Sequence, residues 1–382
     1  MGNFVKNVSE RACVLASDAT WMEDAAVQQL ITTSQLEGMQ RVAGMPDLHP
    51  GRGYPVGAAF FSVGRFYPAL VGNDIGCGMA LWQTDLRAAS TKLDKLEKRV
   101  GNIDGPMTDT AAREQAMQAM QMQPTGYDTA LGTIGGGNHF AEFQQMDTVY
   151  APDALDALGI DRKNLLLLVH SGSRGLGERI LRQHVDAFGH QGLETGSPQA
   201  VAYLAQHAQA LQFARCNRTL VAQRLLTNVR AEGRNLLDIH HNFVDSAQIG
   251  GQTGWLHRKG ATPSDQGPVL IPGSRGNYSY LVQPTKLCTD TLLSLAHGAG
   301  RKWIRSACKD RLFKLMTPTQ MGRTALGGRV ICNDRQLIYE EAPQAYKAID
   351  SVVQSLVGAG LVTLLARTQP VLTYKTRGEC CE

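Results

Sequence analysis

The sequence predicts an α/β fold in which helices surround a mixed sheet, and three observations lead to this prediction. The chain has 382 residues, 43% of them hydrophobic, so it can bury a large core. Short apolar segments bounded by turn-forming residues alternate with longer segments of helical periodicity. No internal repeat is evident, and the polar loops at 195–198 and 260–268 are too short to be convincing linkers. We therefore expect a single large domain over residues 1–382.

Three segments carry apolar residues at steps of three and four, the spacing that places them on one face of a helix. In the longest of them, Leu204, Ala208 and Leu211 follow this spacing. The predicted helices are Thr91–Val100, Pro198–Val229 and Pro343–Val357. Five other segments are short, apolar and flanked by Gly, Asn, Pro or Ser, which is typical of buried strands. The predicted strands are Tyr67–Val71, Leu165–His170, Leu236–His240, Tyr278–Val282 and Leu361–Ala366.

The composition limits the possible functions without choosing one. The 38 basic and 34 acidic residues leave a net charge of +4, which permits a polyanionic partner but does not require it. The longest purely apolar run, Leu165–Val169, is far shorter than the roughly 20 residues of a membrane span, and no basic-then-apolar signal opens the chain. We therefore predict a cytoplasmic protein with no membrane partner.

Cysteine and glycine contents point to a ligand site. The 8 cysteines are too scattered for a disulfide framework and are better explained as buried thiols or metal ligands, while the terminal pair Cys380–Cys381 has no assignable role. The 40 glycines exceed the roughly 27 expected at average usage, and many of them fall in clusters that also carry polar residues.

Two glycine-rich clusters hold candidate ligand-binding residues. Asp74 and Cys77 lie three residues apart where a predicted strand runs into a loop, and both could face one cation, although a turn-capping aspartate and a space-filling cysteine explain the pair better in isolation. The run 132–137 would let backbone amides approach an anion, and Asn138 and His139 follow it directly. No Gly-Lys-Ser/Thr occurs in the chain, so a P-loop NTPase is disfavoured, and a flexible turn explains this run equally well.

Histidines occupy three further positions of interest. His170 ends a predicted strand and opens the segment 171–175, at the sheet edge where ligands of α/β proteins usually bind. His240 and His241 are adjacent in a strand-like stretch, so strand alternation sends them to opposite faces and at most one faces such a site. His297 is surrounded by small residues, and Arg301 would reach the phosphates of a ligand there if a helix began at this point.

Each of these residues alone is as well explained by a structural role, but the joint pattern changes the interpretation. One aspartate, one cysteine and three or four histidines all fall in glycine-rich loops or at predicted strand ends, where a metal site would be assembled. Thiolate and imidazole ligands would favour zinc over manganese, so composition does not identify the metal.

Seven motifs, in this order, resemble the signature set of the RtcB family of RNA ligases over roughly residues 38–375. They are Met45-Pro46-Asp47-Leu48-His49-Pro50-Gly51, Asp74-Ile75-Gly76-Cys77-Gly78-Met79, Gly137-Asn138-His139-Phe140, His170-Ser171-Gly172-Ser173-Arg174-Gly175, His241-Asn242, Pro272-Gly273-Ser274 and His297-Gly298-Ala299-Gly300-Arg301. The resemblance implies the single-domain α/β fold of that family. It also implies the joining of an RNA 3′-phosphate or 2′,3′-cyclic phosphate end to a 5′-hydroxyl end, in RNA repair or tRNA splicing, with GTP and two Mn²⁺ ions.

The resemblance also implies roles for individual residues. Five of them would be metal ligands, with Cys77 bridging the two ions: Asp74, Cys77, His139, His170 and His241. His297 would attack the α-phosphate of GTP, Arg301 would offset developing charge, and the RNA 3′-phosphate would then take the GMP from His297 before the 5′-hydroxyl attacks. Asp47 is the candidate base for that hydroxyl, after any cyclic phosphate has been opened.

The implied nucleotide contacts come from several motifs. Asn138, Arg174 and Ser274 would hold phosphates, and Gly298 lies next to the nucleophile. Glu142 suits guanine, because a carboxylate can accept two hydrogen bonds that adenine does not offer. The remaining guanine contacts would be Tyr346 and Lys375.

The chain departs from the family pattern at two places. Lys302–Ser306 stands where the family has a Ser-Arg pair, and Arg275–Tyr278 replaces a Met-Gly-Thr-Ser run.

Two other functions stay open. One alternative is a metal-dependent RNA-end phosphodiesterase or phosphatase that activates water and forms no nucleotide adduct. The other is a catalytically lapsed RNA-binding paralogue. The identity of the RNA, the oligomeric state and the need for an activating protein are left open.

Overall fold

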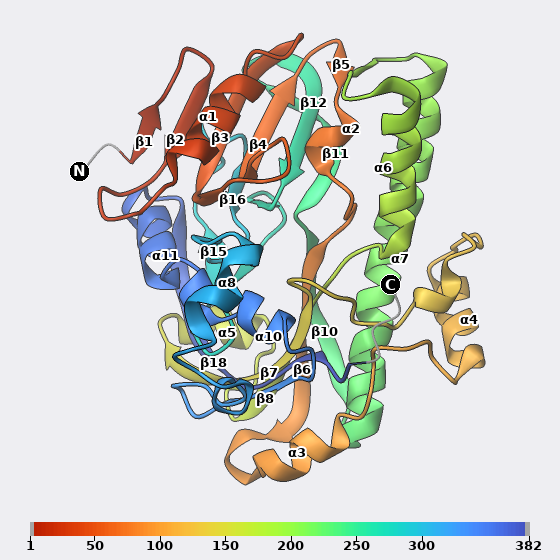
Figure 1. Cartoon of the computed structure of the whole chain (residues 1–382), viewed down its shortest axis with the longest axis vertical. Helices are drawn as coiled ribbons and strands as arrows, with labels where there is room; N and C mark the ends of the chain where they lie inside the picture. The colour runs from red at the N-terminus through yellow and green to blue at the C-terminus, as the bar shows by residue number, and fades with distance from the viewer. Residues whose placement is uncertain (1–3, 379–382) are drawn as a thin grey trace.

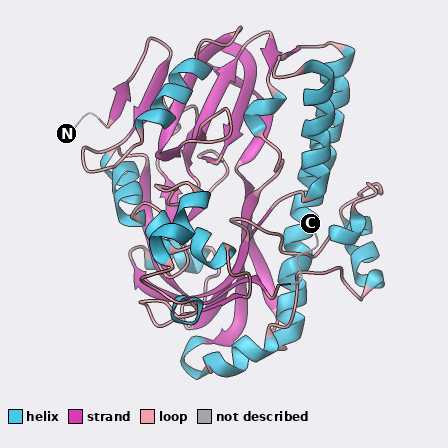
Figure 2. Ribbon diagram, viewed as in Figure 1, coloured by secondary structure: helices cyan, strands magenta, loops and turns pink. Residues whose placement is uncertain are grey.

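The computed structural model describes residues 4–378 and confirms the α/β class. Two large sheets lie one above the other in Figure 1, and helices surround them, as Figure 2 shows. The upper sheet has the strand order β1-β2-β3-β4-β12-β11, and the lower has the order β10-β6-β8-β7-β18-β15-β14, with β17 paired to β18. The β2–β3 and β17–β18 pairs are parallel and the other pairs are antiparallel, so both sheets are mixed. The predicted mixed sheet is therefore two sheets.

The strands of the upper sheet are β1 (Val5–Asn7), β2 (Ala12–Leu15), β3 (Met39–His49), β4 (Val56–Ser62), β11 (Asn242–Ile249) and β12 (Gln252–Lys259). Those of the lower sheet are β6 (Gly78–Arg87), β7 (Phe140–Val149), β8 (Asn164–Ser171), β10 (Gly233–His240), β14 (Val269–Pro272), β15 (Ser279–Pro284), β17 (Arg329–Cys332) and β18 (Val362–Thr376). Two small ladders pair β5 (Arg65–Phe66) with β9 (Leu193–Glu194) and β13 (Ala261–Pro263) with β16 (Ser294–Ala296).

The helices of residues 4–378 are α1 (Asp24–Thr33), α2 (Pro68–Val71), α3 (Leu93–Arg99), α4 (Thr110–Ala119), α5 (Pro152–Ala157), α6 (Gly175–Phe188), α7 (Pro198–Val229), α8 (Arg305–Leu312), α9 (Pro318–Met321), α10 (Leu337–Glu340) and α11 (Ile349–Gly358). Short 3-10 turns occur at Ala88–Ser90, Asp128–Ala130 and Pro343–Ala345. Within this part of the chain, no helix combines the length and the apolar composition that crossing a membrane needs.

Helix α7 is the longest element and supports the lower sheet. It begins with Pro198 after Ser197, whose side chain accepts a hydrogen bond from the backbone N–H of Ala200, so the start signals are local. It ends at Arg230 in the left-handed conformation. At about 1.5 Å per residue it is roughly 48 Å long, and it packs against β6, β8 and β10 on one side and α6 on another (Figure 1).

One buried apolar cluster joins the two sheets. It combines Phe61 and Leu256 of the upper sheet with Ile271 and Val282 of the lower sheet, and α11 contributes Val352. Because both sheets contribute to the same core, separating them would expose apolar surface that is now dry. This shared core supports the proposal of a single domain.

Most predicted elements are confirmed with small shifts at their ends, but three are wrong in part. The predicted strand Leu361–Ala366 covers only the first part of β18, which runs from Val362 to Thr376. The predicted strand Tyr67–Val71 is instead the short helix α2, because Pro68 has the fixed φ that suits a first helical turn and a short apolar run does not distinguish strand from helix. The predicted helix Pro343–Val357 is α-helical only from Ile349. Its first part is a 3-10 turn followed by Tyr346 in an extended conformation, because Tyr346 and Lys347 reach other elements.

The segments that connect the two sheets determine where the candidate site lies. The strand β10 belongs to the lower sheet and β11 to the upper one, and His241 is the single residue between them. The small strand β16 pairs with β13 and ends at Ala296, directly before His297. His241 and His297, which are distant in the sequence, therefore both lie at the junction of the two sheets.

Candidate metal and nucleotide site

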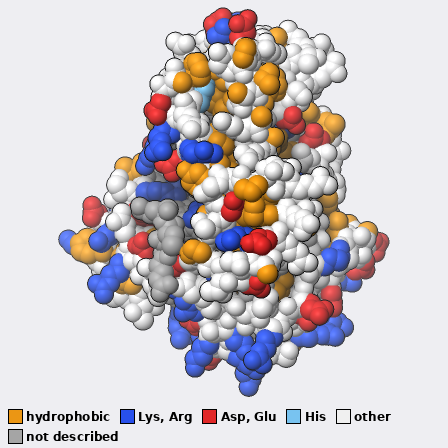
Figure 3. All heavy atoms as spheres, turned by 90° about the vertical axis from the view of Figure 1, so that its right-hand side faces the viewer, with side chains coloured by type: hydrophobic (Ala, Val, Ile, Leu, Met, Phe, Trp, Pro, Cys, Tyr) orange, Lys and Arg blue, Asp and Glu red, His pale blue; other side chains and the backbone are white. Residues whose placement is uncertain are grey.

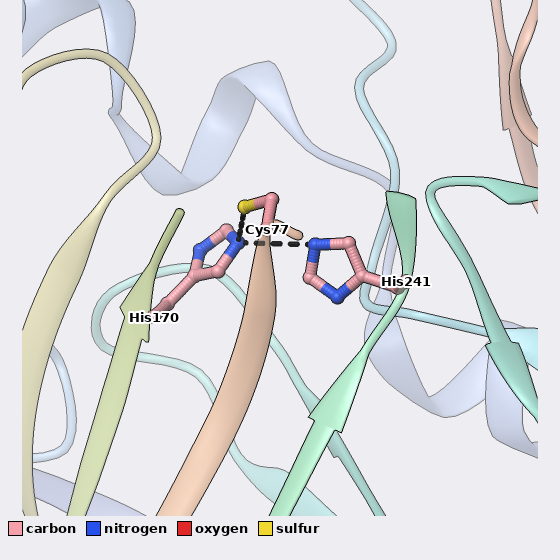
Figure 4. A group of neighbouring side chains, drawn as sticks. All are labelled: Cys77, His170 and His241. Carbon is pink, nitrogen blue, oxygen red and sulfur yellow. Dashed lines mark hydrogen bonds between the residues drawn. The ribbon is translucent and has the colours of Figure 1, made fainter. Parts of the chain in front are cut away.

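Three buried side chains converge at this junction. Cys77 precedes β6, His170 lies near the end of β8, and His241 joins β10 to β11 (Figure 4). The Nε2 atom of His170 is 3.1 Å from the Cys77 sulfur and 3.3 Å from the Nε2 atom of His241. All three residues are no more than 3% exposed. Since their ligand atoms lie within 4.8 Å of one another, they could hold one metal ion.

A second group shares Cys77. Asp74 and His139 complete it, with the Nε2 atom of His139 lying 2.7 Å from Asp74 Oδ2 and 3.5 Å from the Cys77 sulfur. The two groups therefore have one ligand in common, and together they contain all five residues that the sequence motifs suggested. Cys77 is the residue that belongs to both groups.

The protonation states of these groups suit metal ligands. Burial lowers the pKa values of His170 and His241 well below their usual value, so both imidazoles are neutral and have a lone pair to offer. Burial raises the pKa of the Cys77 thiol, and the Asp74 carboxylate raises it further. Burial also acts to raise the pKa of Asp74, but His139 outweighs it and brings that pKa to about 2. Loss of the Cys77 thiol proton beside the Asp74 carboxylate would therefore need a compensating cation, which a divalent ion would provide.

Helix α7 holds the loops that carry these ligands. Arg218, fully buried on α7, donates hydrogen bonds to the carbonyl oxygens of Gly76 and Ser171 and forms an ion pair with Asp238. The neighbouring Asn217 accepts from the backbone N–H of Gly132 and donates to the Gly172 carbonyl. One turn of a rigid helix thus binds the segments next to Cys77, His139 and His170. Their polar groups are satisfied inside the protein, which fixes the ligand positions.

The adjacent histidines behave as strand alternation predicts. His241 faces the cluster, whereas His240 lies on the other side with its Nδ1 atom 2.8 Å from the carbonyl oxygen of Gly76. The prediction that only one of the two faces the site is confirmed.

His297 lies directly beside the cluster. Its ring centroid is 4.8 Å from that of His241, and its Nδ1 atom is 2.6 Å from Oδ2 of the fully buried Asp47. The backbone N–H of His297 donates to the same oxygen. Lys347 donates to the carbonyl oxygens of the two residues flanking Asp47, Pro46 and Leu48, and so fixes the carboxylate. With its Nδ1 atom held in this way, His297 has Nε2 available for chemistry.

A cavity of about 1200 Å³ opens in front of His297. Its walls come from both sheets and from the segment that leads into α8. Of the residues predicted to contact nucleotide, those that line it are Asn138, Glu142, Ser274, His297, Gly298, Arg301, Tyr346 and Lys375. The volume suits a nucleotide with space for a second substrate.

Arg174 and Asp47 are not among the residues that line this cavity. The Arg174 side chain turns toward the loop before His139, where its Nε donates to Thr133 Oγ1. A β-carbon at Gly135 would lie 2.0 Å from the Arg174 guanidinium, so this glycine, with φ of +88°, leaves the space that the arginine occupies. Asp47 lies behind His297, a position that does not favour direct contact with an incoming hydroxyl group.

Glu142 lines the cavity as a buried carboxyl group. Gln144 donates a hydrogen bond to one of its oxygens at 2.6 Å, and the Thr373 hydroxyl donates to the other. Burial raises the pKa of Glu142 to about 7, against the opposing effect of these donors. A group that already has two donors and changes charge near neutral pH is well placed to accept hydrogen bonds from a ligand in the cavity.

Glu341 is the central residue of the cavity wall, and sequence reasoning did not identify it. Its carboxylate, 5% exposed, is 2.6 Å from Arg305 and 3.3 Å from both Arg301 and Lys375. The Tyr346 hydroxyl also donates to it, at 2.8 Å. Burial acts to raise the pKa of Glu341, but Lys375 and the two arginines outweigh it and lower that pKa to about 2. Arg301 starts no helix, since α8 begins at Arg305 instead.

The departure at Arg275 has a structural explanation. Its guanidinium is buried and donates hydrogen bonds to the carbonyl oxygens of Met321, Ile338 and Glu341 at 3.0, 2.7 and 2.9 Å. It therefore ties the Ser274 loop to α9 and α10 and positions the backbone of Glu341. A methionine, which the family pattern places here, would make none of these bonds.

Replacing Arg275 by methionine is expected to reduce the free energy of unfolding by about 3 kcal/mol, because three buried carbonyl oxygens would lose their donor. Urea denaturation followed by circular dichroism measures this difference. The control is Arg335→Met on the exposed surface, which should change the value by less than about 0.5 kcal/mol. Equal stability of R275M and wild type would contradict this role.

The fold and the site define an α/β protein in which a buried Cys/His/Asp cluster suited to metal lies beside a histidine at the wall of a large cavity. The family description "tRNA-splicing ligase RtcB" matches residues 29–128 and 103–376. RNA-splicing ligase RtcB2 of Escherichia coli is 57% identical over 378 residues, which is 99% of both chains. RNA-splicing ligase RtcB of Mycobacterium tuberculosis is 30% identical, covering 90% of this chain and 99% of its own. The tRNA-splicing ligase RtcB of Archaeoglobus fulgidus is 28% identical, covering 92% and 91%. The chain belongs to the RtcB family.

Proposed function

We propose that this protein is an RNA ligase that joins an RNA 3′-phosphate or 2′,3′-cyclic phosphate end to a 5′-hydroxyl end through a guanylylated His297. The relatives that match over nearly the whole chain carry ligase names. The observation that carries the proposal is the position of His297, beside the metal cluster, at the cavity wall, with Nδ1 bound by Asp47.

His297 acts as the nucleophile. Asp47 accepts a hydrogen bond from the Nδ1–H group, so the proton stays on Nδ1 and the lone pair on Nε2 can attack the α-phosphate of GTP. A nitrogen–phosphorus bond forms, the bond to pyrophosphate breaks, and the positive charge on the imidazole is offset by the Asp47 carboxylate. This geometry favours Asp47 as the residue that orients His297 over the earlier assignment as a base for the 5′-hydroxyl.

The five cluster residues hold the metal. Cys77, His170 and His241 surround one position, and Asp74, Cys77 and His139 surround the other. When bound, divalent ions would supply positive charge that offsets the charge developing on the phosphoryl oxygens. The choice of two Mn²⁺ ions follows the family resemblance.

The cavity residues bind the nucleotide. Glu142 accepts hydrogen bonds from the guanine edge, with Tyr346 and Lys375 alongside it. Asn138 and Ser274 hold phosphate oxygens, and Arg174 keeps the loop before His139 in place. Arg301 donates a hydrogen bond to Glu341 and in this way shapes the end of the cavity that takes the phosphates.

The remaining steps transfer the activated phosphate. An oxygen of the RNA 3′-phosphate attacks the phosphorus on His297, the nitrogen–phosphorus bond breaks, and the RNA end now carries GMP. The 5′-hydroxyl oxygen then attacks the RNA 3′-phosphorus, GMP leaves, and a phosphodiester bond remains. A cyclic phosphate is first opened to the 3′-phosphate by water.

Mass spectrometry after incubation with GTP and Mn²⁺ tests the proposal. We expect an increase in intact mass equal to one guanylyl group, that is GMP less one water, which is lost in acid, is stable in alkali and maps to the peptide containing His297. The variant His297→Ala should not gain this mass, whereas His190→Ala, which removes another histidine from the same cavity, should label like wild type. Absence of label, or labelling of H297A, would instead favour an RNA-end phosphodiesterase.

A further inference from the structure

The segment 301–335 has a charge that differs sharply from that of the rest of the chain. It contains nine lysines and arginines against two aspartates, a surplus of seven in a protein whose total is only +4. The other 347 residues therefore carry a net charge of −3. Such a concentration of one sign next to a cavity attracts a polyanion.

Four of these basic side chains are free to bind a partner. Lys302, Lys309, Arg311 and Lys314 are exposed, and none forms an ion pair with any residue between 4 and 378. The acidic side chain closest to them in sequence is the single Asp310. We call these four residues and the aromatic residues Trp303 and Phe313 the α8 surface.

Aromatic rings lie between the charges of the α8 surface. Trp303 has the Arg311 guanidinium over its ring at 4.9 Å and the Lys302 ammonium at 5.7 Å, and Lys314 lies 5.7 Å from the Phe313 ring. Phe313 is 49% exposed, and the neighbouring Ile304 and Leu315 are 65% and 73% exposed. Rings framed by cations offer bases a face for stacking and phosphates a charge to pair with.

The α8 surface is rigid and continues from the cavity. Lys302 and Trp303 themselves line the cavity, so the surface begins at its mouth. Arg305, at the start of α8, is fixed by Glu341, and Leu312 packs with Ile338 and Tyr339 of α10. Figure 1 shows α8 and α10 together on the side facing the viewer. The rings and charges of the α8 surface are thus carried by a segment that packs against α10.

From this geometry we infer that the α8 surface binds single-stranded RNA, namely the strand whose end enters the cavity. The proposal rests on the proposed function for the identity of that strand. A second basic surface, formed by Lys92, Lys95 and Lys98 at and around α3, does not meet these conditions. Among residues 4–378 none of these lysines lies over an aromatic ring, they alternate with Asp94 and Glu97, and they do not line the cavity. Figure 3 shows basic side chains gathered at that lower end of the molecule.

Fluorescence anisotropy measures the proposed contact directly. The probe is a 5′-labelled single-stranded RNA of about 12 nucleotides with a 3′-phosphate, added to the full chain without GTP or metal. The triple variant Lys309→Gln, Arg311→Gln, Lys314→Gln should raise Kd by about tenfold. It should also flatten the dependence of log affinity on log salt by about two, since each lost phosphate contact removes roughly 0.7. Trp303→Ala should weaken binding with no change in that slope.

The matched control is the triple variant Lys92→Gln, Lys95→Gln, Lys98→Gln, which removes the same charge from α3 and should leave Kd within about twofold of wild type. Labelling of His297 by GTP verifies that both triple variants are folded, because none of their substituted residues lines the cavity. Circular dichroism verifies that Trp303→Ala is folded. Equal weakening by both triple variants, or no weakening by the α8 variant, would overturn the inference. Equally tight binding of a blunt RNA duplex would overturn the single-stranded specificity. If wild type forms no GMP adduct, the proposed function fails, but the binding result remains valid.

Discussion

The variant Cys77→Ser is expected to lower the rate of GMP transfer to His297 by about a thousandfold and to reduce the amount of bound manganese. Cys77 belongs to both three-residue groups, so its loss removes a ligand from each position at once. A serine hydroxyl stays protonated near neutral pH and cannot supply the anionic charge of a thiolate. Since loss of a residue that only supports a ligand reduces metal affinity about 10- to 100-fold, loss of a shared ligand should have a larger effect.

Metal content and labelling are measured on the same preparation. Elemental analysis after dialysis gives the manganese content, and intact mass spectrometry gives the rate of adduct formation. Cys216→Ser is the control, because Cys216, on α7, is a fully buried free cysteine in an apolar cluster and belongs to neither ligand group. Wild-type manganese content and labelling in C77S would show that the cluster is not the metal site. Loss of both in C216S as well would assign the effect to folding.

The parts of the fold that were predicted correctly are those with strong local signals. The boundaries of α7 follow from Ser197, Pro198 and a long apolar periodicity, all within the segment itself. The segments Tyr67–Val71 and Pro343–Val357 were misassigned because tertiary contacts decide them. Lys347, for example, interrupts a helical pattern in order to reach carbonyl oxygens of β3.

In the candidate site, too, the local sequence identifies some residues and only the fold identifies others. Four of its five cluster residues stand in glycine-containing motifs and His241 directly follows a predicted strand, so the sequence marks all five, and the structure brings them together. Glu341 stands in no such motif, and only the approach of Arg301, Arg305 and Lys375 from separate elements reveals its position. Arg275 departs from the family pattern, but its three carbonyl acceptors could not be identified without the fold.

The contact between Asp47 and His297 separates two roles for this carboxylate that the sequence could not distinguish. As an orienting residue, Asp47 keeps the proton on Nδ1 and stabilises the positive imidazole that forms as Nε2 bonds to phosphorus. As a base, it would act only in the last step, on the 5′-hydroxyl. The first role affects the adduct on His297, whereas the second affects the joining of RNA ends after the adduct has formed.

Asp47→Asn is therefore expected to slow adduct formation about a thousandfold, because an amide neither carries the charge nor reliably selects the same tautomer. The apparent affinity for GTP should change little, since Asp47 does not line the cavity. Single-turnover labelling with GTP measures the first step, and joining of RNA that already carries GMP at its 3′ end measures the last. Asp350→Asn is the control, because it makes the same change at a carboxylate that accepts a hydrogen bond from Tyr280 and does not line the cavity. If D47N labels at the wild-type rate and slows only the joining step, Asp47 is the base and the orienting role is wrong.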